Sequence, residues 1–407
     1  MKILVICQYY YPEPFRINTI CEELVRRGHE ILVVTGEPNY PEGKIYEGYE
    51  NHQRTDEVIN GVRVHRCPII PRKSGVVFRV LNYYSYVFKA KQFVVSNKCT
   101  TANGSKFDVV FVYQLSPVMM AEPAIAYKRK YNIPVILYCL DLWPESLIAG
   151  GINRDSIPYK YFYRVSKKIY TKMDCILVTS RLFKNYLKNE FNIDERTIDY
   201  LPQYAEKLFE EIPSCKTTST TNFVFAGNIG KAQNIEVILR AAKLIADQGI
   251  TDQGKTIYFH IVGDGQALDD LQNSARINNI NNVIFYGRKP LSEMPKFYSL
   301  ADAMIVSLLP DPLISMTLPA KIQSYMAAGK PIIASADGEI ARVINESGCG
   351  FCAKADDEKE LISKIKLFLG MANRNNLGII AKEYYKENFS ADFFMGKLEN
   401  ILYKSFN

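Results

Sequence analysis

Short apolar runs alternate with segments whose apolar residues recur at helical spacing. In the first half, uninterrupted apolar runs predict buried strands at 3–7, 31–35, 109–112, 135–140 and 175–179. Between the first two runs, Ile17, Ile20 and Leu24 share one helical face and Gly28 follows as a stop signal, so we expect a helix over 16–27. Strands that alternate with helices predict a parallel sheet covered on both faces.

The pattern restarts beyond residues 210–222, a polar stretch rich in Thr and Ser that we interpret as an exposed linker. Strands are expected there at 223–226, 257–262, 283–286, 303–306 and 332–334. A length of 407 residues allows two or three domains. We therefore predict two α/β domains of the same kind, residues 1–210 and 222–407, each with its ligand sites in the loops after the strands.

Positive charge is concentrated in one window. Residues 51–100 hold 9 Lys and Arg against 2 Asp and Glu, mixed with aromatic residues at helical spacing, while the whole chain has a net charge of +7. Such a mixture can seat a helix on an anionic membrane surface. A half-buried helix whose basic stems reach water and a nucleic-acid site are the alternatives. We predict the membrane surface and no nucleic-acid partner.

The cysteines and the hydropathy bear on location. Nine cysteines without regular spacing favour a reducing cytoplasm. The uncharged run over 109–121 is shorter than the roughly 20 residues that a spanning helix needs. We expect a cytoplasmic protein attached peripherally to the membrane.

The loop at 227–234 has the composition of a phosphate site. Gly227 and Gly230 let the backbone approach a ligand, a helix start offers free N–H groups, and Lys231 adds a cation. The glycine spacing matches neither the dinucleotide fingerprint nor the P-loop, and a turn without a ligand is the alternative. Two further loops follow predicted strands at 263–265 and 287–290 and could serve the same nucleotide.

A helix is predicted after the loop at 310–316. Thr317 suits its N-cap, Pro319 its first turn and Gly329 its end. Lys321 then lies in the first turn, where a cation disfavours the helix dipole. That position indicates an anionic ligand, and a tolerated surface lysine is the alternative.

Polar residues also follow strands of the first half. Asp141, Trp143 and Glu145 come after the strand at 135–140, and either carboxylate could act as a general base or hold a sugar hydroxyl. Glu13, Arg16 and Asn18 follow the first strand. Surface, capping or turn roles are the alternatives. Neither an HExxH nor an acidic DxD triplet occurs, so no metal site is expected.

Together these loops resemble the retaining GT-B glycosyltransferases of family 4, over nearly the whole chain. The second half carries the specific features, at 227–234, 261–265, 283–287, 298–303 and 327–333. The runs at 8–13, 141–146, 227–233 and 319–325 resemble the bacterial branch that adds an N-acetyl-L-fucosamine-type sugar in O-antigen or capsule assembly. The resemblance implies two Rossmann-like, doubly wound parallel-sheet domains facing a central cleft, with the last helix crossing back to the first domain. It also implies a UDP-sugar donor, no cofactor, and a saccharide acceptor linked to undecaprenyl diphosphate.

The chain departs from the family at its usual charged residues. Met316 and Ser324 stand where the family has two glutamates, and Asn228 and Gln233 stand where it has an Arg and a Lys. Lys231 and Lys321 are the expected replacements. A UDP-sugar epimerase or hydrolase, or a non-catalytic binding protein, remains an alternative.

The expected roles fall into three groups. The catalytic group is Asp141, Lys231 and Lys321. The donor-binding group is Gly227, Asn228, Gln233, Gly263, Asp264, Gly265, Arg288, Lys289, Thr317, Leu318, Gln323 and Ser324. The acceptor-binding group is Glu13, Arg16, Asn18, Trp143 and Glu145.

Overall fold

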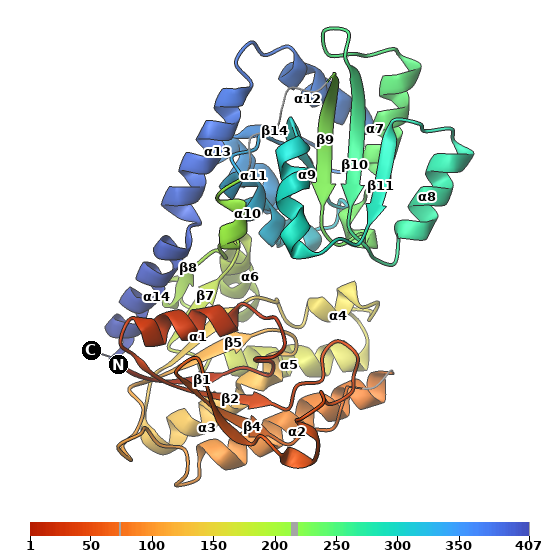
Figure 1. Cartoon of the computed structure of the whole chain (residues 1–407). Helices are drawn as coiled ribbons and strands as arrows, with labels where there is room; N and C mark the ends of the chain where they lie inside the picture. Colours follow the sequence, from red (N-terminus) through yellow and green to blue (C-terminus); the bar gives the residue numbers. More distant parts are fainter. Residues whose placement is uncertain (73–74, 213–218, 407) are drawn as a thin grey trace. The chain divides into compact units, whose positions relative to one another are not determined.

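The computed structural model describes residues 1–72, 75–212 and 219–406. The chain divides into two compact units, the first made of residues 1–179, 183–201 and 395–407 and the second of residues 180–182 and 202–394. Each unit is one sheet with helices on both of its faces (Figure 1). The predicted α/β class is therefore confirmed for both halves.

The sheet of the first unit has eight strands in the order β3-β4-β2-β1-β5-β6-β7-β8. Their bounds are β1 (Lys2–Ile6), β2 (Glu30–Gly36), β3 (Asp56–Ile59), β4 (Val62–Cys67), β5 (Val109–Gln114), β6 (Val135–Cys139), β7 (Cys175–Val178) and β8 (Ile198–Tyr200). The chain runs outward from β1 to β4, returns to β5 beside β1, and then runs outward the other way. The topology therefore reverses between β1 and β5.

One edge of this sheet is antiparallel, which the sequence interpretation did not foresee. Strand β3 pairs with β4 in the antiparallel sense, with Ile59 opposite Val62. Asn60 and Gly61 form the two-residue connection at φ +49° and +83°. Both φ values are positive, as the hairpin turns that suit a right-handed strand twist require, and Asn-Gly is the preferred pair for them. The expectation of a wholly parallel sheet is wrong at this edge.

The helix predicted over 16–27 is confirmed as α1 (Ile17–Arg26), and the first unit has further helices on its sheet. They are α2 (Val76–Val94), α3 (Glu122–Tyr131), α4 (Ser146–Ala149), α5 (Ile157–Tyr170), most of α6 (Arg181–Phe191), and α14 (Ala391–Phe406) from Met395 onward. The predicted stripe on α1 is confirmed, since Ile17, Ile20 and Leu24 are all buried. This stripe fixes α1 on the sheet and so orients the loop that joins β1 to it.

The sheet of the second unit has six parallel strands in the order β11-β10-β9-β12-β13-β14. Their bounds are β9 (Thr220–Ala226), β10 (Thr256–Val262), β11 (Val283–Gly287), β12 (Ala303–Ser307), β13 (Ile332–Ser335) and β14 (Gly350–Ala353). The helices are α7 (Glu236–Asp247), α8 (Leu268–Ile277), α9 (Met294–Leu300), α10 (Ala320–Ala327), α11 (Gly338–Ser347), α12 (Glu358–Leu369) and α13 (Asn375–Asn388). The topology reverses between β9 and β12.

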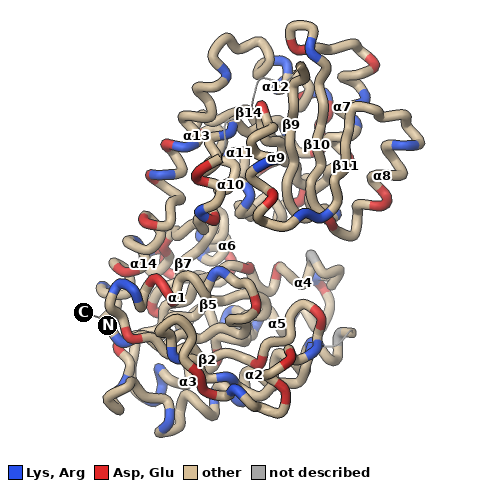
Figure 2. The backbone as a smooth tube through the Cα atoms, viewed as in Figure 1, with Lys and Arg blue, Asp and Glu red and all other residues tan. Residues whose placement is uncertain are grey.

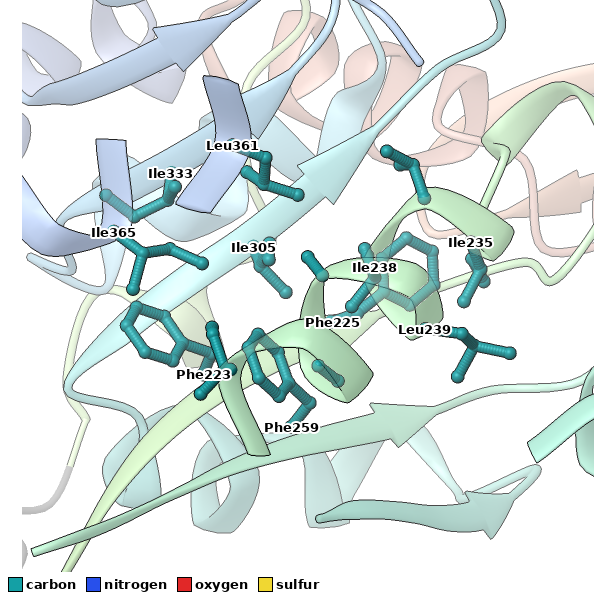
Figure 3. Close-up of a cluster of buried hydrophobic side chains, with 14 of the residues drawn as sticks. Phe223, Phe225, Ile235, Ile238, Leu239, Phe259, Ile305, Ile333, Leu361 and Ile365 are labelled. Atoms are coloured by element: carbon teal, nitrogen blue, oxygen red, sulfur yellow. The ribbon is translucent and has the colours of Figure 1, made fainter. Parts of the chain in front are cut away.

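Buried aromatic and branched side chains hold this second sheet against its helices. Phe223 and Phe225 of β9 lie in one cluster with Phe259 of β10, and Ile238 of α7 and Ile365 of α12 close over them (Figure 3). All five are fully or almost fully buried. Full burial of such side chains contributes about 1.5–3 kcal/mol each, so the strand that leads into the 227–234 loop is firmly held.

The predicted linker at 210–222 is wrong at its end. Thr221 and Asn222 belong to β9 and are buried, and residues 213–218 lie outside the described residues. The Thr221 hydroxyl donates to Asp252 at 2.7 Å, and the Asn222 side-chain oxygen is 2.9 Å from Nε2 of His260. Buried partners let polar residues occupy a strand, and composition alone cannot reveal such partners.

Ligands of open α/β sheets bind outside the carboxyl ends of the strands, at the point where the topology reverses. In the first unit that point lies at the loops after β1 and β5. In the second unit it lies at the loops after β9 and β12, the second of which leads into α10.

Candidate functional site

Three glycines in the second unit bring the loops after β9 and β10 together. A Cβ on Gly263 would lie 1.8 Å from the Gly227 oxygen, and a Cβ on Gly265 would lie 2.4 Å from the Ile229 oxygen. The Gly227 and Ile229 amides donate to Val262 and Asp264 at 2.9 and 2.8 Å. The glycines at 263 and 265 thus allow two loop backbones to touch, which is a packing reason for a pattern that the sequence assigned to ligand binding.

The loop after β9 continues into a 3₁₀ turn, η5 (Lys231–Gln233), and α7 starts only at Glu236. The Gln233 side-chain oxygen accepts from the backbone N–H of Gly230 at 3.0 Å and from the side-chain NH2 of Asn228 at 3.3 Å. Asn228 and Gln233, which replace the family's Arg and Lys, therefore bond to one another and fix the loop. Lys231 is exposed beside them.

Lys321 is an enclosed cation at the reversal point. Its Nζ is buried, makes no hydrogen bond to any described residue, and lies 3.9 Å from the centroid of the Phe225 ring. A Cβ at Gly227 would lie only 3.0 Å from this Nζ, so the absence of a side chain at 227 makes room for it. Burial lowers the pKa of Lys321 to about 7. Because a buried cation without an ion pair or hydrogen bond to the described residues is costly, Lys321 is a candidate side chain for binding an anion.

Lys321 stands at the start of α10, but the predicted cap is wrong. The helix begins at Ala320, its N-cap is Pro319, and Thr317 lies exposed two residues earlier. Proline fixes its own φ and disfavours a helical conformation of the residue before it, which favours a helix start after Leu318. No side chain caps α10, which leaves its first N–H groups without side-chain acceptors beside Lys321.

Two predicted donor-binding side chains of α10 have partners inside their own helix. The Ser324 hydroxyl donates to the Ala320 carbonyl at 3.3 Å. The buried Gln323 amide lies against the carbonyls of Pro319 and Ala320, at 3.0 and 3.1 Å. Leu318 is also buried. These positions face the first turn of α10, and their direct contact with a donor stays a prediction.

The remaining predicted donor residues follow β10 and β11. The Gly263 amide donates to the Gly287 carbonyl at 3.0 Å, which joins the two loops. Arg288 and Lys289 leave β11 directly after this contact, as two adjacent cations. Figure 2 marks the Lys and Arg positions of the chain in blue. Asp264 accepts from the Gly265 amide at 2.8 Å. The loops after β10 and β11 lie at the same edge of the sheet as the loops that carry Lys231 and Lys321, because β11, β10, β9 and β12 are adjacent and parallel.

In the first unit, the predicted Glu13 is buried in the loop after β1. One of its oxygens accepts from the amides of Asn39 and Tyr40 at 2.9 and 2.7 Å, and the other has no hydrogen-bond partner among the described residues. Burial raises the pKa of Glu13 to about 7, although the backbone hydrogen bonds act in the opposite direction. Glu13 can therefore accept or donate a proton near neutrality. Asn18 donates to the Glu13 carbonyl at 2.8 Å, and Arg16 is half-buried.

The loop after β6 is held by its own polar contacts. Asp141 accepts from the Ser146 hydroxyl at 2.5 Å, and burial raises its pKa. The Trp143 ring nitrogen donates to the Ser116 hydroxyl at 2.8 Å. Glu145 is buried and accepts from Arg154 and the Tyr159 and Tyr186 hydroxyls at 2.6, 3.0 and 2.5 Å. Glu145 thus has partners that explain it structurally, whereas Asp141 is the better placed of the two for a ligand.

Sequence reasoning missed a group of residues around Tyr9. Its hydroxyl is buried without a hydrogen bond of ordinary geometry, and its ring stacks on Phe15 at 5.2 Å. Burial raises the pKa of Tyr9, while the Arg72 guanidinium acts to lower it. Arg72 and Tyr83 were assigned to the basic window instead. They are far from Tyr9 in sequence, so only the fold reveals the group.

The basic window itself divides in the structure. Arg66 is buried and pairs with Glu57 at 2.5 Å, and Lys91 pairs with Glu122 at 2.8 Å. Tyr86 is fully buried. Buried Tyr86 and the ion pair of Lys91 favour the half-buried-helix alternative for part of the later turns of α2, where Phe88 and Lys89 are nevertheless exposed. The membrane surface stays a prediction. Lys73, which belongs to the predicted window, lies outside the described residues.

Residues 1–72, 75–212 and 219–406 contain neither a membrane-spanning helix nor a metal-binding group of side chains. Within them, no helix is long and apolar enough to cross a membrane. No group of three or more His, Cys, Asp and Glu side chains in the same ranges could hold a metal ion. The expectation of a metal-independent reaction stays a prediction.

Comparison with known sequences identifies both halves. Residues 15–203 match the family described as Glycosyl transferase 4-like domain, and residues 212–384 match the family described as Glycosyl transferases group 1. The chain is similar to the probable glycosyltransferase WbjE of Pseudomonas aeruginosa, with 27% identity over 67% of this chain and 68% of the relative. It is also 21% identical to the putative colanic acid biosynthesis glycosyl transferase WcaI of Escherichia coli K12, over 94% of this chain and 95% of the relative.

Solved structures share the fold. The crystal structure of Anabaena HepE with UDP and glucose is similar with a TM-score of 0.68 and 13% identity, over 99% of both chains. That of WaaG, a glycosyltransferase involved in lipopolysaccharide biosynthesis, is similar with a TM-score of 0.65 and 13% identity, over 99% of both chains. The predicted fold class is confirmed by these likenesses.

Proposed function

Because the chain belongs to the GT-B glycosyltransferases of family 4, we propose that it moves a sugar from a UDP-sugar to a saccharide carried on a lipid diphosphate. The observation that carries this proposal is the buried, unpartnered Nζ of Lys321. It lies at the carboxyl end of β9, beside the uncapped start of α10. A diphosphate is the anion that this enzyme class must hold, and a buried cation with free helix amides suits it.

The reaction requires that the negative charge developing on the leaving diphosphate be stabilised. The bond between the anomeric carbon and the diphosphate oxygen breaks, and a bond from that carbon to the acceptor oxygen forms. Negative charge grows on the leaving diphosphate, where Lys321 and the first amides of α10 stabilise it, with Lys231 and Arg288 as nearby cations. The acceptor proton passes to the leaving phosphate. Losing one preorganised donor of this kind raises a barrier by about 2.7–4 kcal/mol.

The names of similar proteins support the finer statement. WcaI is named for colanic acid biosynthesis, WaaG for lipopolysaccharide biosynthesis, and HepE was crystallised with UDP. We propose by analogy a role in bacterial surface polysaccharide assembly, with retention at the anomeric carbon and no metal or cofactor. N-acetyl-L-fucosamine is the donor sugar that the motif resemblance suggests.

In the first unit we propose the acceptor site. Glu13 is a buried carboxyl and Asp141 a half-buried one, at the ends of β1 and β6, and desolvation raises the pKa of both. Each can hold a sugar hydroxyl, and Glu13, with a pKa of about 7, can exchange a proton near neutrality. Trp143, Arg16, Asn18 and Glu145 belong to the same two loops. Glu145, with three partners of its own, acts by holding its loop.

The test incubates the protein with a panel of UDP-sugars, with and without lipid-linked saccharides, and follows UDP release and product. We expect UDP release only when donor and acceptor are both present, and no loss on adding EDTA. Lys321→Ala should reduce turnover by about 10²–10³-fold. The exposed Lys366 of α12 provides a matched control, and Lys366→Ala should keep full turnover.

Two outcomes contradict the proposal. UDP release without acceptor would indicate a hydrolase or epimerase, and UDP binding without any release would indicate a binding protein. Normal turnover of Lys321→Ala would remove Lys321 from the reaction.

The first turns of α2 supply a membrane contact in this proposal. Val77, Phe78 and Leu81 are 70%, 41% and 43% exposed, and Arg79 is exposed with them. Apolar side chains with nearby cations suit the surface of an anionic bilayer. Co-sedimentation should show stronger binding to anionic than to neutral vesicles, and Phe78→Ser with Leu81→Ser should abolish it. Equal binding to both kinds of vesicle would contradict the electrostatic part.

A further inference from the structure

Arg72 stands between two tyrosine rings in the first unit. Its guanidinium carbon lies 5.6 Å from the centroid of Tyr40 and 5.8 Å from that of Tyr83. Its backbone amide donates to the Asn39 side-chain oxygen at 3.1 Å, which fixes the main chain at this point. No carboxylate within the described ranges forms an ion pair with it. The structure therefore holds a guanidinium in place by stacking and leaves its charge uncompensated.

Polar atoms without partners face the same region. The buried Tyr9 hydroxyl makes no ordinary hydrogen bond, and burial raises its pKa while Arg72 acts against that rise. Burial likewise raises the pKa of Tyr83, with Arg72 and Arg79 opposing and Asp141 adding to it. Both hydroxyls are therefore protonated donors. The buried Glu13, the other acid near this group, has a second oxygen without a partner.

The protonation of the Glu13 and Asp141 carboxyls affects which ligands this region can bind. Burial is the leading cause that raises the pKa of both Glu13 and Asp141. A neutral carboxyl does not repel an anion and can donate to it. One fixed cation with several neutral donors suits an anion that brings many acceptor oxygens.

The helix that follows Arg72 suggests what the anion is attached to. Helix α2 begins at Val76, and the side chains of Val77, Phe78, Val80 and Leu81 are all exposed. Apart from the exposed Arg79, these turns present apolar side chains to the outside of the unit. An exposed apolar surface of this kind marks a place where an apolar partner binds.

We propose that Arg72, with the hydroxyls of Tyr9 and Tyr83, binds the diphosphate of a polyprenyl-diphosphate acceptor, and that the first two turns of α2 contact its isoprenoid chain. This inference rests on the proposed function, since a lipid-linked acceptor is what it seats. The charge of Arg72, unpaired among the described residues, suits an anionic headgroup, and the exposed apolar turns suit the isoprenoid chain that carries it. Guanidinium pairs with phosphate in two hydrogen bonds, which an ammonium cannot do.

The experiment uses the full-length protein and farnesyl diphosphate as the probe, measured by calorimetry. Arg72→Gln should weaken binding of the probe by about 10–100-fold, the loss of a charged hydrogen-bonded pair. Arg72→Lys should recover only part of it. Lys89→Gln removes a charge from exposed α2 outside the tyrosine pair and should change the affinity less than about twofold. Farnesol and inorganic phosphate should each bind far more weakly than the probe.

Further arms separate the possible sources of phosphate and the two proposals. In vesicles of phosphatidylglycerol without acceptor, Arg72→Gln and Lys89→Gln should lose binding alike, because only general charge acts there. UDP affinity should be unchanged in Arg72→Gln.

The subsite is overturned if Arg72→Gln binds farnesyl diphosphate as the wild type does, or if Lys89→Gln loses as much affinity. It is also overturned if inorganic phosphate binds as tightly as the probe. Turnover with a lipid-linked acceptor and an unchanged KM for it in Arg72→Gln would contradict this inference and leave the proposed function standing. The reverse, loss of probe binding in Arg72→Gln by a protein that transfers no sugar, would contradict only the proposed function.

Discussion

Lys321 lowers the stability of the free protein, and that cost is measurable. Its folded-state pKa of about 7 lies below the ordinary 10.5, so between these pH values the unfolded chain binds more protons and stability rises with pH. Lys321→Met should therefore be more stable than the wild type at pH 7, by on the order of 4 kcal/mol, and the difference should shrink toward pH 10. Denaturant unfolding at both pH values measures this.

Lys366→Met provides the control, because its side chain is exposed and should show no such pH-dependent gain. A Lys321→Met protein that is less stable at pH 7 would mean that Nζ has a partner in the free state. The same variant should fail to turn over donor, which would separate stability from function at one residue.

Glu13 presents the opposite case. Burial raises its pKa from 4.5 to about 7, so its contribution to stability is fully present below pH 4.5 and is lost as pH rises through about 7. Glu13→Gln should be about 1–3 kcal/mol more stable than the wild type at pH 8 and no more stable at pH 4.5. Thermal unfolding across this range, with the exposed Glu42→Gln as control, tests it. A difference that does not depend on pH would show that Glu13 is charged in the folded state throughout.

Single residues differ in how far the sequence reveals them. Lys321 is recognisable because a lysine in a first helical turn opposes the helix dipole, and Glu13 because it follows a predicted strand. Arg72 carries no such local signal. Its meaning depends on Tyr40 and Tyr83, which reach it from two other segments, and a linear pattern does not record which segments a sheet brings together.

At the scale of elements, the loops after β9 and β10 act as one unit. Gly263→Ala would place a Cβ 1.8 Å from the Gly227 oxygen at a φ of +147°, so the loops must separate. We expect a loss of about 2–4 kcal/mol in stability and a raised KM for the donor, because Lys321 lies against Gly227. Calorimetry and steady-state kinetics would measure the two effects.

Gly249→Ala separates backbone strain from loop contact. Gly249 has a φ of +60° but nothing within 4 Å of a new Cβ. It should cost about 1 kcal/mol and leave the donor KM unchanged. Equal effects of the two substitutions would show that strain alone, and no loop contact, explains the loss at Gly263.

Strands were more predictable than the points at which elements begin. Apolar runs located β1, β6 and, with His260 as an exception, β10, because strands buried on both faces are mostly apolar. Thr317 was mistaken for a cap because Thr is a preferred N-cap, whereas Pro319 is itself extended and disfavours a helical residue before it. The hairpin at Asn60 and Gly61 was missed although that pair is a strong local signal, because the alternation suggested parallel strands only.

At the scale of the whole molecule, the first unit depends on the far end of the chain. Glu399 of α14 accepts from Arg27 at 2.7 Å and contacts Nε2 of His29 at 2.8 Å, and all three residues belong to the first unit. Leu398 and Leu402 of the same helix are fully buried. A fragment that ends near residue 201 would expose the surface that these side chains cover. Experiments on the first unit therefore need the C-terminal helix as well as residues 1–201.

The one tryptophan makes the two units distinguishable in that chain. Trp143 is buried in the first unit, so its fluorescence reports the unfolding of that unit alone, whereas calorimetry reports both. If UDP binds at Lys321 and the loops after β9, its binding energy stabilises the second unit, by about 2.7 kcal/mol at a concentration of 100 Kd. We expect UDP to raise a calorimetric transition while the Trp143 transition stays within error. Farnesyl diphosphate should do the reverse, because Arg72 and Tyr9 belong to the unit that contains Trp143. Lys321→Met and Arg72→Gln should each remove one of the two shifts and keep the other. If UDP, added without farnesyl diphosphate, shifted the Trp143 transition, the nucleotide would bind in the first unit. That result would contradict the assignment of the donor site and of the acceptor site.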